Sequence, residues 1–306
     1  MLDTVRLKHY FLQPFGKDDL RRRGAIPLPR RNLNSSYILR PCADESTLPP
    51  ITIYQDPRGK THVEIELSIP KLLFRHNAKL PNQEELCACL NQLTNYVSSH
   101  IGRPFTAMNA AVSRVDYTRD IFIGNSGVIT ELRRLRGRRL ARCTRQTFED
   151  TTIYFTSKAK TFQVRIYSKL DEVIAHSPLN EMALIEAAGI LRFEICLKNR
   201  RTVVQRTKHL HPASLNADGL LTQSTSDQMF DDLFHSLDWQ PGGSECIGTI
   251  DSIMQVYPGT TGLALLGYLQ AIEHYGGSPV RLALLGIRKA TYYRNKRRLK
   301  DCGIII

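Results

Sequence analysis

Four stretches of the chain alternate polar and apolar residues with a period of two, a pattern typical of half-buried β-strands. They span residues 62–67, 113–116, 164–169 and 191–195. Within each stretch the polar side chains share one face, because successive side chains of a strand point to opposite sides. If these strands form one antiparallel sheet, one face packs on a core and the other gathers charged side chains. The pattern predicts an α+β fold with a polar sheet face and helices on the other face.

The stretch 164–169 carries side chains that suit phosphoryl chemistry. As a strand it places Arg165, Tyr167 and Lys169 on one face. Neighbouring cations favour a phenolate and attract a phosphodiester, so this face suits a tyrosine that attacks a DNA or RNA phosphate. The alternative interpretation is an edge strand with a solvated Arg/Tyr/Lys face, in which Lys169 is only a solvated strand end.

The other three stretches supply carboxylates. Glu66, Asp116 and Glu194 each lie at a polar position of an alternating segment. Oxygen ligands from separate strands suit a hard cation, so we expect Mg²⁺ or Mn²⁺ beside the tyrosine. Glu194 keeps two interpretations: a metal ligand or general base, or a salt bridge to Arg192 or Arg165.

These segments follow one another in a recognisable order. The chain reads Ile65-Glu66 through Lys71-Leu72, then Arg114 through Asp120, then Arg165 to Lys169, then Arg192 through Lys198. Over roughly residues 1–205 this order resembles that of rolling-circle replication initiators of small plasmids and filamentous phages, the phage gene II type. The resemblance implies an enzyme that nicks a replication origin, with Tyr167 attached to the 5′ phosphate and a 3′ hydroxyl left for a polymerase. It also implies that Asp116, Glu66 and Glu194 are candidates for holding the metal.

Two other functions fit the same pattern. A non-catalytic origin-binding protein or repressor would keep the sheet but do no chemistry, and a transposase or relaxase would share the chemistry on another substrate. For an initiator we expect single-stranded and duplex origin DNA as the substrate. A host helicase and a single-strand-binding protein would be its partners. A homodimer with one tyrosine from each subunit would explain how a second cleavage is made.

Charge agrees with a nucleic-acid partner. Lys and Arg number 42 against 29 Asp and Glu, a formal net charge of +13 and a pI near 9.5. No long apolar run is present, so we expect no membrane partner. The seven cysteines are scattered without a CxxC pair, which favours reduced thiols in the cytoplasm of a bacterial host over a zinc site.

Residues 131–145 contain seven arginines interrupted by leucines. The spacing predicts a helix on the sheet with a basic outer face, weakened at Gly137. Its arginines would bind the DNA backbone, or they would form only a solvated face. The DNA-binding candidates here are Arg133, Arg134, Arg138 and Arg139.

Residues 151–157 and 161–168 predict a hairpin around Lys158-Ala159-Lys160. In a symmetric register Tyr154 pairs with Val164 and faces away from Tyr167, whereas a slip of one residue reverses this. We therefore do not expect Tyr154 to be a second nucleophile. The pair His209 and His211 follows Tyr167 and opens a polar segment, so we interpret it as close to a linker and not as a metal clamp.

The C-terminal part of the sequence has mainly helical patterns. We predict a catalytic domain at 1–205, a linker with a short helix at 206–245 and a helical domain at 246–306. A short helix, a turn at Gly286-Ile287 and a helix from about residue 289 fit a helix-turn-helix, with Tyr292 and Leu299 in its core. The alternative is a basic helix packed on the catalytic domain. The groove-side candidates are Arg288, Lys289, Tyr293, Arg294 and Arg297.

Overall fold

The computed structural model describes residues 1–31, 34–41, 48–56, 60–148, 151–176, 180–239, 253–275, 282–283 and 286–302. The fold is α+β, and the chain divides into two compact units. Unit 1 comprises residues 1–119, 156–164 and 194–233, and unit 2 comprises residues 120–155, 165–193 and 234–306.

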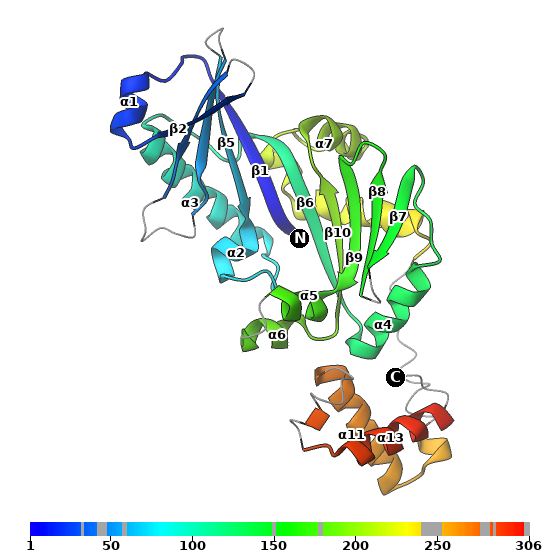
Figure 1. Ribbon diagram of the computed structural model, residues 1–306. Helices are drawn as coiled ribbons and strands as arrows, with labels where there is room; N and C mark the ends of the chain where they lie inside the picture. Colours follow the sequence, from blue (N-terminus) through cyan, green and yellow to red (C-terminus); the bar gives the residue numbers. More distant parts are fainter. Residues whose placement is uncertain are drawn as a thin grey trace. The chain divides into compact units, whose positions relative to one another are not determined.

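The described strands form one ten-stranded sheet in the order β2-β3-β4-β5-β1-β6-β10-β9-β8-β7 (Figure 1). Pairing is antiparallel between β1 and β5, β1 and β6, β2 and β3, β3 and β4, and β4 and β5. The predicted large antiparallel sheet is thus confirmed. The strands are β1 (Leu2–Phe11), β2 (Ile26–Arg31), β3 (Asn34–Leu39), β4 (Ile51–Gln55), β5 (Thr61–Ser68), β6 (Ala111–Phe122), β7 (Cys143–Phe148), β8 (Thr152–Ser157), β9 (Phe162–Ser168) and β10 (Ile190–Leu197).

Strand β5 shows how the alternation builds the core of unit 1. Val63, Ile65 and Leu67 are buried, and the residues between them are only partly buried. Opposite them in the register, Leu7 of β1 and Ile51 of β4 are also buried. The apolar face therefore faces the core, as the period of two predicts.

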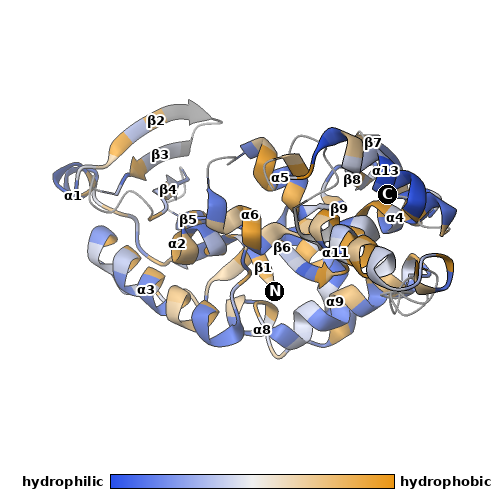
Figure 2. Ribbon diagram, turned by 90° about the horizontal axis from the view of Figure 1, so that it is seen from below, coloured by the Kyte–Doolittle hydropathy of each residue, from blue (hydrophilic) through white to orange (hydrophobic). Residues whose placement is uncertain are grey.

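Helix α3 (Gln83–Ile101) covers one face of these strands (Figures 1 and 2). It begins at Asn82, whose side chain accepts a hydrogen bond from the Glu85 backbone N–H while Glu85 bonds back to the Asn82 N–H, so both ends of a capping box are present. It ends at Gly102, which has a left-handed φ of 65°. The sequence predicts this helix and both of its ends, because Leu86, Leu90, Leu93 and Val97 have helical spacing between a capping Asn82 and a terminating Gly102.

The other helices are mostly short. Their bounds are α1 (Lys17–Arg22), α2 (Ile69–Phe74), α4 (Gly124–Leu135), α5 (Lys169–His176), α6 (Glu181–Ala187), α7 (Arg200–Thr207), the 3₁₀ helix η2 (Lys208–Leu210), α8 (Ala217–Leu220), α9 (Gln223–Ser236), α11 (Thr260–Tyr275) and α13 (Lys289–Asp301). Within the described residues, none of the helices combines the length and the apolar character needed to cross a membrane.

Much of the segment 206–245, which is expected to be a linker with a short helix, is folded into helices. Residues 217–236 form α8 and α9, and Leu220 and Phe230 are fully buried. The Tyr117 hydroxyl donates a hydrogen bond of 2.9 Å to the Leu220 carbonyl, which ties α8 to β6 within unit 1. The polar residues that suggested a linker instead serve local turns; the Thr225 hydroxyl, for example, bonds to the Gly219 carbonyl. Residues 240–245 lie outside the described residues.

The predicted helix over residues 131–145 is wrong in its second half. Helix α4 ends at Leu135, and residues 143–148 form strand β7. Gly137 donates its backbone N–H to the Arg134 carbonyl in a turn, and Arg142 has a left-handed φ of 61°. The leucine spacing suggested one helix, but the chain turns at these two residues.

Helix α13 lies where the sequence predicts the last helix, from about residue 289. Tyr292 and Leu299 of α13 are buried in a cluster with Leu265, Tyr268 and Leu282. Gly286 has a left-handed φ of 78° at the predicted turn before α13. The two predicted core contacts of the last helix, Tyr292 and Leu299, are thereby confirmed.

Candidate active site

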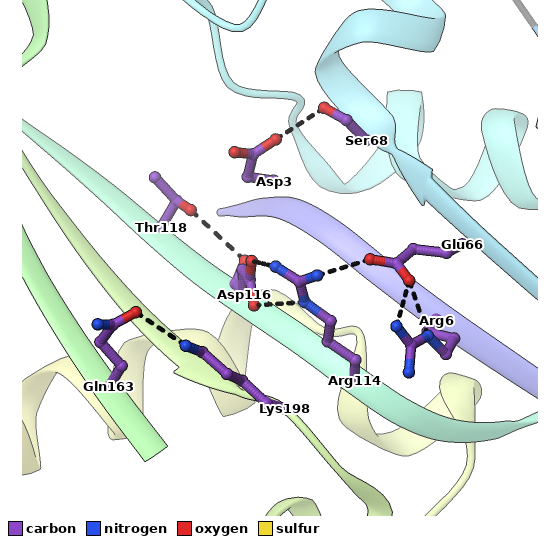
Figure 3. Close-up of polar contacts among 9 residues, drawn as sticks. All are labelled: Asp3, Arg6, Glu66, Ser68, Arg114, Asp116, Thr118, Gln163 and Lys198. Carbon is purple, nitrogen blue, oxygen red and sulfur yellow. Dashed lines mark hydrogen bonds and ion pairs between the residues drawn. The ribbon is translucent and has the colours of Figure 1, made fainter. Parts of the chain in front are cut away.

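Charged side chains of β1, β5 and β6 form a connected cluster in unit 1 (Figure 3). The Arg114 guanidinium donates to Asp116 Oδ2 at 2.6 Å and to Glu66 Oε1 at 2.6 Å. Arg6 donates from Nε to Glu66 Oε2 at 2.8 Å. Arg114 therefore lies between two of the three carboxylates that are predicted as metal ligands, Asp116 and Glu66, and Glu66 joins two arginines. We call these four residues the Arg114 cluster.

The two carboxylates that Arg114 contacts raise the pKa of its guanidinium. Burial alone would lower the pKa of Arg114, but the hydrogen bond and charge of Asp116 and the charge of Glu66 raise that pKa far above its usual range. The side chain of Asp116 is 4% exposed, whereas those of Arg114 and Glu66 are 22% and 36% exposed. The Arg114 guanidinium thus stays charged, and water reaches the cluster on its Glu66 side.

Next to the Arg114 cluster, Lys8 and Glu64 form a pair of 3.3 Å between Nζ and Oε1. A hydrogen bond from His62 and the charge of Lys8 outweigh burial and hold the pKa of Glu64 below its usual range. Sequence reasoning missed Arg6 and Lys8. The signal was present in the first strand, where both residues alternate with buried Val5 and Leu7.

The placement of the carboxylates bears on the expected metal. Among the described residues, no group of three or more His, Cys, Asp or Glu side chains is arranged to hold a metal ion. Glu194 on β10 is 3% exposed and does not complete such a group with Glu66 and Asp116. As placed, the pair Glu66 and Asp116 binds a guanidinium, so a cation between them requires Arg114 to release at least one carboxylate.

Tyr167 lies on β9 in unit 2 and is 8% exposed. Two residues further, Lys169 begins helix α5, is fully buried, and donates from Nζ to Glu172 Oε2 at 2.6 Å. The interpretation of Lys169 as a solvated strand end is therefore wrong, because its ammonium is buried with a carboxylate partner on the first turn of a helix. Arg165 is partly buried on the same strand.

The predicted register of the β8–β9 hairpin is wrong by one residue. The Gln163 side chain bonds to the Thr156 hydroxyl at 3.1 Å, and the Arg165 guanidinium lies 6.0 Å from the centre of the Tyr154 ring. These contacts place Arg165 opposite Tyr154, so Tyr154 shares a face with Arg165 and Tyr167. The turn is the cause: Lys160 has a φ of 56°, and the Phe162 N–H bonds to the Ser157 side chain, which leaves four residues in the loop.

Arg192 and Asp120 form a second arginine–carboxylate site, in unit 2. Arg192 donates from Nε and Nη2 to the two Asp120 oxygens at 2.6 and 2.7 Å. The guanidinium side chain is fully buried and Asp120 is 19% exposed. Arg192 thus has a carboxylate partner other than the Glu194 that the sequence suggests.

The basic candidates occupy two places within unit 2. Arg133 and Arg134 are exposed on α4, whereas Arg138 and Arg139 follow the helix, and Arg138 pairs with Asp238 at 2.8 Å. In Figure 2, α13 is coloured almost wholly as hydrophilic. Its predicted groove-side residues Arg288, Lys289, Tyr293, Arg294 and Arg297 are all exposed.

The family of the chain follows from its middle part. The family model for the N-terminal region of the phage replication-associated protein, the gene II protein, matches residues 44–216. The chain belongs to this family. The resemblance to phage gene II-type initiators is thereby confirmed, and the match spans Glu66, Asp116, Tyr167 and Glu194. It ends before α9 and therefore does not include α11 or α13.

Other comparisons add little. A search of curated proteins gave no match. A solved structure with some likeness is the crystal structure of the di-domain ARO/CYC StfQ from the steffimycin biosynthetic pathway, with 10% identity, 76% of this chain and 97% of that chain covered, and a TM-score of 0.23. A likeness at that score carries no argument about fold or function.

Proposed function

We propose that this replication-associated protein nicks DNA at a replication origin and rejoins it, with Tyr167 as the nucleophile. The observation that carries the proposal is Tyr167 itself, which lies between Arg165 and Lys169 inside the segment matched by the replication-associated family. A cation beside a phenol favours its ionised form and attracts the phosphodiester, a role that Arg165 of the same strand would take, whereas Lys169 would first have to release Glu172. Because Tyr167 is 8% exposed, the reaction requires a local opening when DNA binds.

The proposed step is a transesterification. The Tyr167 oxygen forms a bond to the scissile phosphorus, the bond to the 3′ oxygen breaks, and the phenol proton passes to a base, for which Glu194 is a candidate. The leaving 3′ oxygen takes up a proton from water, so the products are a phosphotyrosine at the 5′ end and a free 3′ hydroxyl. Attack by another 3′ hydroxyl reverses the step and joins the strand without ATP, since the phosphodiester energy is kept.

A divalent cation is part of the proposal. Mg²⁺ or Mn²⁺ would polarise the scissile phosphate and neutralise developing charge. Asp116 and Glu66 remain the proposed ligands, with Glu194 as a further candidate. Their pairing with Arg114 means that cation binding competes with an ion pair.

We further propose that α13 contacts duplex origin DNA as the second helix of a helix-turn-helix. The support is its row of exposed cations together with a buried opposite face. Exposed Arg133 and Arg134 of α4 are proposed backbone contacts, which would make binding sensitive to salt. A host helicase, a single-strand-binding protein and a homodimer stay predictions, as does the cytoplasm as the site of action.

The alternative function is a non-catalytic origin-binding protein or repressor. One observation favours it: two of the three predicted metal-binding carboxylates, Glu66 and Asp116, are engaged by arginine. Such a protein would need the charged sheet but neither Tyr167 nor a cation.

One experiment separates the two functions. Supercoiled DNA carrying the gene and its flanks is incubated with Mg²⁺ or Mn²⁺, or with a chelator, and assayed for nicked circles and a denaturant-stable protein–DNA adduct. We expect both products from wild type, and neither from Tyr167→Phe, which keeps the ring and loses the nucleophilic oxygen. Tyr154→Phe is the matched control on the neighbouring strand and should retain the adduct.

Three other results would change the nucleophile or the function. An adduct that persists in Tyr167→Phe and disappears in Tyr154→Phe would move the nucleophile to Tyr154. Nicking without an adduct in any variant would indicate a nuclease that uses no tyrosine. Tight binding without nicking, on DNA that includes the origin, would favour the origin-binding protein.

A further inference from the structure

Three aromatic rings form a row across unit 1. In the strand register Tyr10 of β1 pairs with His62 of β5, and His62 pairs with Tyr54 of β4. The ring centres of Tyr10 and His62 lie 5.5 Å apart, and those of His62 and Tyr54 lie 4.8 Å apart with the rings stacked at 17°. We call these three residues the aromatic row.

The aromatic row projects from the sheet face opposite the core. The neighbours of its members along the strands, Thr61, Val63 and Ile53, are buried with exposures of 1% or less. Side chains at alternate positions point to the other side, and Tyr10 is 62% exposed. The rings therefore line a face that solvent reaches at Tyr10.

The aromatic row shares this face with the Arg114 cluster. The pair Lys8 and Glu64 lies two residues from the row along the strands, and the pair Arg6 and Glu66 lies four residues from it. At about 3.4 Å per residue, the row lies roughly 14 Å along the strands from the cluster. Stacking groups and ionic groups thus follow each other on the same strands.

We propose that the aromatic row binds unpaired bases of single-stranded DNA. This inference rests on the proposed function, which requires a strand to be opened and held near the Arg114 cluster. Aromatic rings on a sheet stack with any base, because every base has a π face. A duplex would not use them, since its bases already stack on one another.

Charge and exposure favour this occupant over a purely structural role. Cross-strand aromatic pairs do stabilise sheets, but that role favours burial of the rings, and Tyr10 is mostly exposed. Lys8 Nζ lies 5.3 Å from the centre of the Tyr10 ring, where it can accompany a phosphate while a base stacks on the ring. The net charge of +13 suits the same polyanion.

The test is a binding experiment that does not depend on cleavage. The full chain with Tyr167→Phe is titrated at fixed salt into a fluorescent oligothymidylate and, separately, into an abasic oligonucleotide of equal length. We expect Tyr10→Ala to weaken binding of the oligothymidylate by roughly 5-fold to 150-fold and to leave abasic binding unchanged. Tyr10→Phe should bind like the parent, because it keeps the stacking ring.

Leu12→Ala is the matched control, since Leu12 is fully exposed on the same segment and carries no ring. Equal loss of both oligonucleotides in Tyr10→Ala, or no loss of either, would overturn the proposal, as would a Tyr10→Phe variant as weak as Tyr10→Ala. The two proposals fail differently. If wild type nicks DNA but binds the oligothymidylate no better than the abasic oligonucleotide, the proposal for the aromatic row is refuted and the proposed function stands. If binding depends on Tyr10 but wild type never nicks DNA, only the proposed function is refuted.

Discussion

Two arginine–carboxylate sites involve carboxylates of strand β6, and they differ in the exposure of the arginine. Arg192 is fully buried and donates from Nε and Nη2 to one carboxylate, that of Asp120. Arg114 is 22% exposed and divides its donors between Asp116 and Glu66. Breaking the pair of a fully buried guanidinium leaves a charge away from water, whereas the partly exposed Arg114 can exchange a carboxylate for a ligand. The comparison separates a site that holds the fold from one suited to binding.

The largest effect on stability is expected at the buried pair of Arg192 and Asp120. Asp120→Ala should lower the free energy of unfolding by about 3–5 kcal/mol, because it removes the carboxylate that faces a buried guanidinium. Urea denaturation measures the change. The control is Asp227→Ala, since Asp227 also pairs with an arginine but is 44% exposed, so its loss should cost no more than about 1 kcal/mol. Equal costs for the two variants would break the distinction between buried and exposed pairs.

A smaller effect on stability, with a larger one on activity, is expected in the Arg114 cluster. Asp116→Ala should lower the free energy of unfolding by about 1.5–3 kcal/mol, since Arg114 keeps Glu66 and contact with water. By the proposed function it should also abolish metal-dependent nicking, measured on supercoiled DNA. Asp120→Asn is the comparison, because it changes the other carboxylate of β6 conservatively. Full nicking activity in Asp116→Ala would refute a catalytic role for the carboxylates.

The smallest effect is expected from pH at Glu64. The pKa of Glu64 is lowered in the folded protein, so its ionised form contributes stability above the usual glutamate pKa, and this contribution is lost as pH falls below about 4.3. Wild type should exceed Glu64→Gln in unfolding free energy at pH 7, by no more than about 1 kcal/mol, and the difference should vanish in acid. A difference that grows as pH falls would contradict this sign.

Much of the sheet and of helix α3 could be predicted from the sequence. The alternation in β5 identified the core residues Val63 and Ile65, and Asn82 and Gly102 marked the ends of α3. Such features depend on contacts within a few residues, which a sequence displays directly. The burial of Tyr292 and Leu299 was predictable for the same reason.

Contacts between strands were less predictable. The alternation in β9 placed Arg165 and Tyr167 on one face, but it did not say which residue of β8 lies opposite, and the turn moved Tyr154 by one position. The period likewise gave Arg114 and Asp116 a common face but could not reveal that Arg114 also holds Glu66 from another strand. The buried pair of Arg192 and Asp120 was missed for the same reason.

The sequence by itself determined which side chains share a face of each strand, where α3 begins and ends, and, through the order of its motifs, the family of the chain. Only the tertiary structure decided which charges neutralise one another, where the arginine-rich helix stops and which rings lie side by side. The physical reason is that periodicity is a property of one element. Partnership between elements depends on register, and register is set by turns such as the one at Lys160, where a single residue reverses the face.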